Sequence, residues 1–189
     1  MKFIKTDIEG VVIIEPTVYG DERGYLFESF SLREFTEQVG CVEFVQENES
    51  YSRYGVVRGL HFQKPPYAQA KLVRVIKGRV IDVAVDIRQG SPTYGKHIAV
   101  ELSEDNHRQI YIPRGFAHGF AVLSEDVIFQ YKCDNYYCPQ SEGGIAWNDE
   151  QIGIDWQLPT ADITLSAKDK EHKKLSEQDC FFQYNKNEK

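Results

Sequence analysis

The feature that most limits the fold of this chain is a series of short extended segments separated by turn residues. The clearest segment, residues 79–87, alternates so that Ile81, Val83, Val85 and Ile87 fall on one face of a strand. Similar segments recur at a spacing of roughly 8–12 residues, which is typical of antiparallel sandwiches and barrels. We therefore expect an all-β fold, with strands within residues 3–14, 25–30, 42–48, 50–54, 56–62, 71–76, 79–87, 98–102, 109–112, 119–123 and 127–132.

Helical signals are confined to two short segments. Ser31 and Glu34 have the spacing of a capping box, and apolar residues at helical intervals predict a helix that stops at Gly40. Ser166 opens a second, polar helix that is predicted to reach Leu175, and residues 183–189 are expected to fray. The chain has no glycine-rich loop between a strand and a helix, which argues against a Rossmann or P-loop nucleotide site.

Length and charge limit the function. We expect one domain spanning residues 1–189. The net charge of −7, without a basic stripe, argues against binding of nucleic acid, so an anionic ligand would need local arginines and lysines. We expect no signal peptide and no membrane span. Four irregularly spaced cysteines predict reduced thiols in the cytoplasm rather than a zinc knuckle: Cys41, Cys133, Cys138 and Cys180.

Arg58, His61 and Lys71 lie within fourteen residues on predicted strands, where a small anionic substrate could be held. His61 stands between Leu60 and Phe62 and must point away from both. It is a surface residue if those two face the core, and it faces the lumen if the sheet closes into a barrel. A histidine titrates near neutral pH and is the usual general base. Lys71 is equally compatible with a solvated strand position.

His118 ends the segment Pro113-Arg-Gly-Phe-Ala-His118, which resembles the second motif of the cupin jelly rolls. In cupins the histidine of this motif often binds a metal. The first cupin motif would supply two further histidines and a glutamate, but here His61 is followed two residues later by Gln63. Two imidazoles are fewer than the three protein ligands of a typical catalytic zinc site. The sequence therefore predicts a jelly roll without a metal and without another cofactor.

Three further residues each have a structural and a functional interpretation. Tyr131 is either a core or rim tyrosine or a proton donor, and Arg23 is either a surface ion-pair partner or a phosphate ligand. Asp169 stands three residues after Ser166, which is the spacing of a helix N-cap and its acidic partner. From the residues alone, the capping interpretation of Asp169 is the simpler one.

Several motifs, occurring in order over residues 3 to 180, resemble the dTDP-4-dehydrorhamnose 3,5-epimerase family. They are Asp21-Glu-Arg23-Gly, Gln46-Glu-Asn48, Val57-Arg58-Gly-Leu-His61-Phe-Gln, Ala70-Lys71-Leu-Val-Arg, Pro113-Arg-Gly-Phe-Ala-His118-Gly-Phe and Leu165-Ser-Ala-Lys168-Asp169. The resemblance implies a cupin-like jelly roll that uses no metal. It also implies epimerisation of dTDP-4-dehydro-6-deoxy-D-glucose at C3 and C5, on the route to dTDP-L-rhamnose.

The resemblance also implies a role for each candidate residue. His61 would be the base, Asp169 the carboxylate that orients it, Lys71 the group that stabilises the enolate, and Tyr131 the acid on the opposite face. Family members are homodimers that exchange N-terminal strands, so Arg23 and Glu28 would serve the neighbouring subunit. The implied substrate contacts are Arg23, Glu28, Gln46, Glu47, Asn48, Arg58, Lys71, His118, Glu142 and Lys168.

Three alternatives stay open at this stage. Relatives with the same catalytic residues act at C3 alone, at C5 alone, or as ketoisomerases on other nucleotide sugars. A cupin-like module that binds a nucleotide sugar without turnover would need no base and acid. A metal-dependent cupin enzyme would need ligands that this sequence does not offer.

Overall fold

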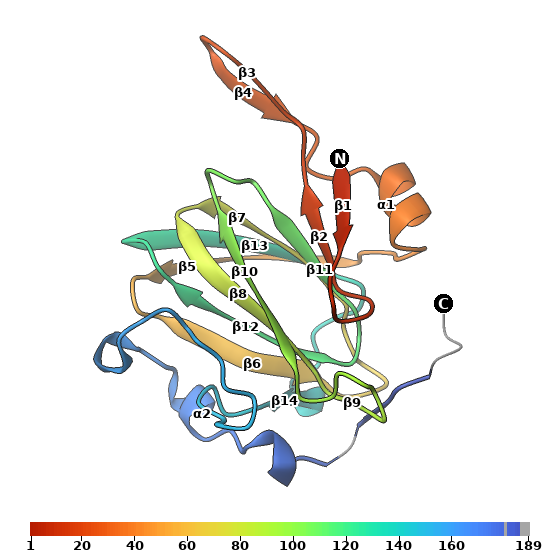
Figure 1. Ribbon diagram of the computed structural model, residues 1–189, viewed down its shortest axis with the longest axis vertical. Helices are drawn as coiled ribbons and strands as arrows, with labels where there is room; N and C mark the ends of the chain where they lie inside the picture. The colour runs from red at the N-terminus through yellow and green to blue at the C-terminus, as the bar shows by residue number, and fades with distance from the viewer. Residues whose placement is uncertain (180, 186–189) are drawn as a thin grey trace.

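The computed structural model describes residues 1–179 and 181–185, and it contains two antiparallel sheets packed face to face (Figure 1). One sheet has the strand order β1-β2-β11-β7-β13-β5 and the other β10-β8-β12-β6-β14. The expected cupin-like jelly-roll class is confirmed. The strands are β1 (Lys2–Lys5), β2 (Val12–Glu15), β3 (Val18–Asp21), β4 (Gly24–Phe27), β5 (Gln46–Arg53), β6 (Val57–Gln63), β7 (Lys71–Lys77), β8 (Arg79–Asp86), β9 (Arg88–Gln89), β10 (His97–Ser103), β11 (Gln109–Ile112), β12 (Phe116–Val122), β13 (Asp126–Cys133), β14 (Glu142–Gly144) and β15 (Phe182–Gln183).

The main core lies between the two sheets. Val73 of β7 and Ala84 of β8 are fully buried in it, and the Phe120 and Phe129 rings stack across the sheets with centroids 3.9 Å apart. Side chains alternate between the two faces of a strand, so a strand of either sheet directs every second residue into this core. The six-stranded sheet thus forms one wall of the interior, and the five-stranded sheet forms the other.

The outer face of the five-stranded sheet is also buried. Ile81, Val83 and Val85 of β8 pack there against the segment that follows β14, including Trp156. The alternating apolar face predicted for residues 79–87 is therefore this outer face. The opposite face of β8 points into the interior and carries Asp82, which is fully buried. This arrangement leaves a carboxyl group inside the sandwich, where it needs a hydrogen-bond or charge partner.

The helices are few and short. They are α1 (Leu32–Gln38), α2 (Ala167–Lys170) and the 3-10 turns η1 (Pro139–Ser141), η2 (Thr160–Asp162) and η3 (Leu175–Glu177). Helix α1 covers the six-stranded sheet through Phe35, whose side chain is 1% exposed. In the part of the chain that the structure describes, no helix combines the length and the apolar character that a membrane crossing requires.

Three local predictions differ from the structure. Residues 42–45 do not form a strand, because Val42 packs on the α1 cluster while the chain runs toward β5. The Ser31 side chain makes no capping hydrogen bond. The second helix ends at Lys170 instead of Leu175, whose N–H is held by Asp149 Oδ2 at 2.7 Å.

The C-terminal tail is paired further than expected. Gln183 belongs to β15, which pairs in parallel with β9, so the paired chain continues past the predicted start of fraying. Residues 186–189 lie outside the described residues, as does Cys180. Among the residues that the structure does describe, Cys41, Cys133 and Cys138 carry free thiols.

Strands β3 and β4 form a hairpin that projects from the body of the molecule (Figure 1). Its apolar side chains are exposed: Tyr19 by 67%, Tyr25 by 63% and Leu26 by 73%. Large apolar side chains on an isolated two-stranded ribbon gain little from their own hairpin. This hairpin is therefore a surface that a partner could cover.

Candidate active site

Polar side chains from both sheets meet in the interior. His61 on β6 lies directly opposite His118 on the neighbouring strand β12. Tyr131 on β13 lies opposite Asn48 on β5 and Val73 on β7 in the other sheet. His61 and Tyr131 thus come from opposite walls of the sandwich. Strands fix the direction of their side chains, which suits a site that must hold a substrate in one orientation.

His61 and Asp169 form a short contact in this group. Their atoms Nε2 and Oδ1 are 2.5 Å apart, and the Asp169 side chain is 4% exposed against 31% for His61. Burial alone would raise the pKa of the Asp169 carboxyl, but the hydrogen bond and charge of His61 outweigh it and hold that pKa below its ordinary value. An ionised carboxylate only accepts, so His61 donates through Nε2, and in a neutral imidazole Nδ1 is then the acceptor.

Asp169 takes part in a helix N-cap through its backbone and contacts His61 through its side chain. Its backbone N–H donates to Ser166 Oγ at 3.1 Å, which is the N-cap expected from the sequence. Its carboxylate is directed to His61 and not back to the cap. The cap fixes the backbone at the start of α2, and this holds the carboxylate against the imidazole.

His118 pairs with Asp82 deeper in the interior. His118 Nε2 is 2.8 Å from Asp82 Oδ2, and both side chains are buried. Burial lowers the pKa of His118, and the Asp82 carboxylate acts against this shift without cancelling it. The His118 imidazole is therefore neutral at neutral pH. The other Asp82 oxygen, Oδ1, is buried without a hydrogen-bond partner among the described residues.

Lys71 and Tyr131 lie together on the other wall. The Lys71 Nζ is 5.7 Å from the centroid of the Tyr131 ring. Burial lowers the pKa of Lys71, and the nearby acidic groups Asp82 and Glu142 act against that shift. Burial raises the pKa of Tyr131, so its hydroxyl carries a proton at neutral pH. The group therefore offers one acceptor, at His61, and one protonated phenol.

Glu142 connects the two walls electrostatically. Its charge contributes to raising the pKa of Tyr131, and the charge of His61 contributes to lowering the pKa of Glu142. The Glu142 carboxylate forms an ion pair with Lys168 and accepts a hydrogen bond from the Tyr137 hydroxyl at 2.7 Å. The rings of residues 61 and 131 therefore border one connected group of charges.

Gln46, Asn48 and Arg58 also turn toward this group. Gln46 Nε2 donates to Asn48 Oδ1 at 3.0 Å, and the Arg58 Nε donates to Ser52 Oγ at 3.0 Å. Arg58 belongs to the five-stranded sheet and Ser52 to β5 of the other, so Arg58 spans the two walls. A guanidinium between the two sheets can contact a diphosphate group.

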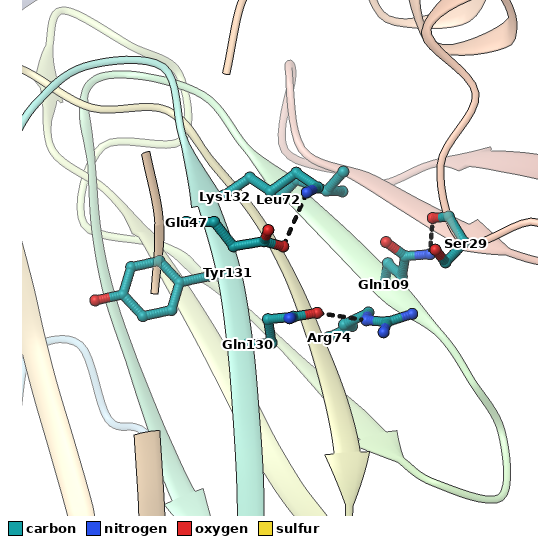
Figure 2. Close-up of a pocket in the computed structure, with 8 residues that line it drawn as sticks. All are labelled: Ser29, Glu47, Leu72, Arg74, Gln109, Gln130, Tyr131 and Lys132. Atoms are coloured by element: carbon teal, nitrogen blue, oxygen red, sulfur yellow. Dashed lines mark hydrogen bonds and ion pairs between the residues drawn. The ribbon is translucent and has the colours of Figure 1, made fainter. Parts of the chain in front are cut away.

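Glu47 lies on the other face of β5. Its carboxylate accepts from Lys132 Nζ at 2.8 Å on the outside of the six-stranded sheet. Figure 2 shows this pair and the Arg74–Gln130 pair in a shallow outer pocket, with the Tyr131 hydroxyl directed away from them. Glu47 is next to Asn48 on the same strand, so the two side chains point to opposite faces of the sheet. This placement directs the Glu47 side chain away from the interior, and the expected contact of Glu47 with the substrate stays a prediction.

Arg23 and Glu28 are not brought to His61. Arg23 lies in the turn between β3 and β4. Its side chain is 85% exposed and pairs with Asp21 at 2.5 Å. Glu28 follows the hairpin and is exposed as well. Both residues lie on or beside the hairpin, and their expected action on a neighbouring subunit stays a prediction.

Three residues beside the predicted site residues were not expected from the sequence. Asp82 had a usable signal, because an acidic residue inside an apolar alternating strand is costly unless it is paired. Tyr137, which donates to Glu142, gave no signal among the eleven tyrosines of the chain. His172 contacts the Asp169 carboxylate at 3.5 Å, and its position three residues after Asp169 was the only available hint.

Comparison with known proteins gives a consistent result. A family model described as dTDP-4-dehydrorhamnose 3,5-epimerase matches residues 5–177. The dTDP-4-dehydrorhamnose 3,5-epimerase of Shigella flexneri is 53% identical over 182 residues, which is 96% of this chain and 99% of the relative. The crystal structure of a Legionella pneumophila 3,5-epimerase in complex with dTDP-4-keto-L-rhamnose has a TM-score of 0.93 and 49% identity, covering 97% of this chain and 98% of that one.

A more distant relative has a narrower activity. The crystal structure of a 3'-monoepimerase from Streptomyces bikiniensis in complex with dTDP-quinovose has a TM-score of 0.83 and 31% identity, covering 90% of this chain and 86% of that one. The fold is thus shared between enzymes that invert one carbon and enzymes that invert two. This chain is more similar in sequence to the two 3,5-epimerases above than to the monoepimerase.

Proposed function

The chain belongs to the dTDP-4-dehydrorhamnose 3,5-epimerase family, and we propose that His61 and Tyr131 perform the proton transfers of this reaction. The reaction inverts C3 and C5 of dTDP-4-dehydro-6-deoxy-D-glucose and gives dTDP-4-dehydro-L-rhamnose. The observation that carries the proposal is the placement of a paired imidazole and a protonated phenol on opposite walls of one interior.

The substrate supplies its own activation through the C4 ketone. Protons on C3 and C5 are acidic because the carbanion left by their removal spreads onto the C4 oxygen as an enolate. His61 Nδ1 accepts the proton, and Asp169 stabilises the imidazolium that results. The ionised state of Asp169, favoured by its lowered pKa, is the state that this role requires.

Lys71 is placed to stabilise the enolate oxygen. It is held in the interior beside Tyr131, where an ammonium interacts with developing negative charge more strongly than in water. Asp82 and Glu142 favour its charged form against the effect of burial. His118, held by Asp82, lies beside His61 on the next strand and lines the same wall as a contact for the sugar.

Tyr131 returns a proton to the face of the ring opposite His61. Because base and acid belong to different sheets, a sugar bound between them loses a proton on one side and gains one on the other, which inverts the carbon. The raised pKa of Tyr131 keeps its hydroxyl protonated and ready to donate. Substrate contacts from the same chain are then Gln46, Asn48, Arg58, Lys71, His118, Glu142 and Lys168.

The test of this function is incubation with dTDP-4-dehydro-6-deoxy-D-glucose in deuterated water. We expect one deuterium at C3 and one at C5, measured by NMR of the product, because each inversion replaces a substrate proton with one from the solvent. Label at a single carbon would indicate a monoepimerase. The absence of label at both carbons, with the sugar nucleotide still bound, would indicate a binding module and overturn the proposal.

We further propose a homodimer in which the β3–β4 hairpin of one subunit reaches the site of the other. The exposed apolar side chains of the hairpin and its projection away from β6 (Figure 1) support this arrangement. In a closed two-fold dimer, each subunit then lends Arg23 and Glu28 to its partner's substrate.

Mixing two inactive variants is expected to restore activity if the hairpin acts on the partner. Arg23→Ala and His61→Ala are each expected to be impaired, but a mixed dimer contains one site with both residues intact. Random re-association should recover about a quarter of the parental activity, since half of the dimers are mixed and each has one working site. The measurement is turnover after mixing and dissociation, with each variant alone as the control. No recovery from mixed dimers would show that Arg23 acts within its own chain.

A further inference from the structure

His172 lies against the His61–Asp169 pair, and the proposed reaction does not use it. It follows the end of α2 by two residues, and its ring is 5.6 Å from the ring of His61 at an angle of 79°. Its side chain is 11% exposed. Its Nε2 is buried 3.5 Å from Asp169 Oδ1 in a geometry that makes no hydrogen bond, and it has no other partner among the described residues. A buried ring nitrogen without a partner is costly.

The fold makes room for this imidazole. A Cβ at Gly144 of β14 would collide with Nε2, Cε1 and Cδ2 of the His172 ring. Gly144 lies opposite His61 in the pairing of β14 with β6. The absence of a side chain at residue 144 therefore lets the second imidazole approach the first.

Three donor atoms converge at this point. His61, Asp169 and His172 each offer one atom, and these atoms all lie within 4.8 Å of one another. Two imidazole nitrogens and one carboxylate oxygen form the ligand set of many zinc sites that keep a fourth position open. Zinc bonds of about 2.1 Å place tetrahedral donors about 3.4 Å apart. The Asp169–His172 separation of 3.5 Å matches this value.

The His61–Asp169 separation must open to admit a metal. It is 2.5 Å when a proton lies between Nε2 and Oδ1, so the two atoms would move apart by about 1 Å as the metal replaces that proton. Asp169 lies on a helix of four residues, whereas His61 is fixed on a central strand. The movement therefore falls on the Asp169 side chain.

We propose that His61, Asp169 and His172 form a site for a divalent transition metal such as Zn²⁺, and that its occupation inhibits the enzyme. The metal takes the lone pair of His61 Nε2, and the proton that Nε2 carried moves to Nδ1 of the same ring. Nδ1 then bears a hydrogen and can no longer accept a proton from the substrate. The metal is an inhibitor here and has no part in the epimerisation. The inhibition rests on His61 being the base, whereas the binding does not.

The experiment measures binding and turnover separately on the full chain. Co²⁺ is titrated into metal-free protein, and we expect the visible absorption bands of a four-coordinate ion to saturate near one equivalent per protomer. Micromolar Zn²⁺ is expected to abolish these bands and to inhibit turnover, and EDTA is expected to restore activity. Binding without inhibition would support the metal site and overturn the assignment of His61 as the base.

Variants identify the ligand. His172→Phe keeps a planar ring but removes the nitrogen. Its turnover without metal is measured as its own baseline, and relative to that baseline it should need at least roughly 10-fold more Zn²⁺ for half inhibition. His97→Phe, on β10, is the matched control and should stay as sensitive as the parent. Thermal unfolding checks the folding of each variant, and His172→Leu replaces His172→Phe if the larger ring is not tolerated. Equal sensitivity of the His172 variant and the parent, or the lack of cobalt bands, would overturn the proposal.

Discussion

Replacing His61 by alanine is expected to lower kcat by about 10²–10⁴-fold, the usual contribution of a well-placed general base. The substitution removes the only group that we assign to proton abstraction. Affinity for dTDP should change little, because the nucleotide is assigned to other residues, among them Arg58. The measurements are turnover with dTDP-4-dehydro-6-deoxy-D-glucose and dTDP binding by calorimetry.

Two controls make the His61 result interpretable. His97→Ala removes an imidazole from β10 and should leave kcat unchanged. The His61 variant leaves the buried Asp169 carboxylate without its partner, so its thermal unfolding must be compared with that of the parent. A folded His61→Ala protein that turns over within a few-fold of the parent would remove His61 as the base.

Replacing Tyr131 by phenylalanine is the second large effect that we expect. The ring stays, so its contacts with Phe129 and with the Lys71 ammonium are kept, and only the hydroxyl is lost. Abstraction by His61 still occurs, but delivery of a proton on the far face fails. Product formation should fall by about 10²–10³-fold, within the range for general acids. Exchange of substrate protons with deuterated water should fall much less.

The ratio of exchange to product formation is the decisive quantity for Tyr131. A general loss of activity from misfolding would lower both equally, whereas loss of the acid lowers product formation alone. Tyr111→Phe is the matched control, because Tyr111 is a buried tyrosine in the outer cluster under α1 and should affect neither quantity. Parental rates of both processes in Tyr131→Phe would make Tyr131 a structural residue.

The fold class could be predicted because strand spacing and alternation are local properties. Residues 79–87 illustrate both the strength and the limit of that prediction. The alternation correctly predicted a strand with one apolar face, but both faces of β8 are buried, and the second face carries Asp82 into the interior. Alternation assigns residues to faces but does not say what covers each face.

Two site residues show the same limit. Whether His61 faced solvent or a lumen was open, because Leu60 and Phe62 could point to either of two cores. The structure buries them on the outer face of the five-stranded sheet, beneath the segment that follows β14, and so turns His61 inward. For Asp169 the sequence offered a choice between a helix cap and a catalytic carboxylate. In the structure its backbone N–H takes part in the cap, and its carboxylate contacts His61. A single domain and a cytoplasmic location stay predictions.

The sequence by itself determined most of the strands, the absence of a nucleotide-binding glycine loop and, through the motifs it shares with a family, most of the candidate site residues. These depend on patterns within a few residues of one another, which survive without knowledge of the fold. Only the tertiary structure decided which side chains meet. His61 and Asp169 are separated by 108 residues, and Asp82, His118 and His172 join them through pairings between distant segments. Such contacts are set by the packing of both sheets and the C-terminal segment, and no local pattern encodes them.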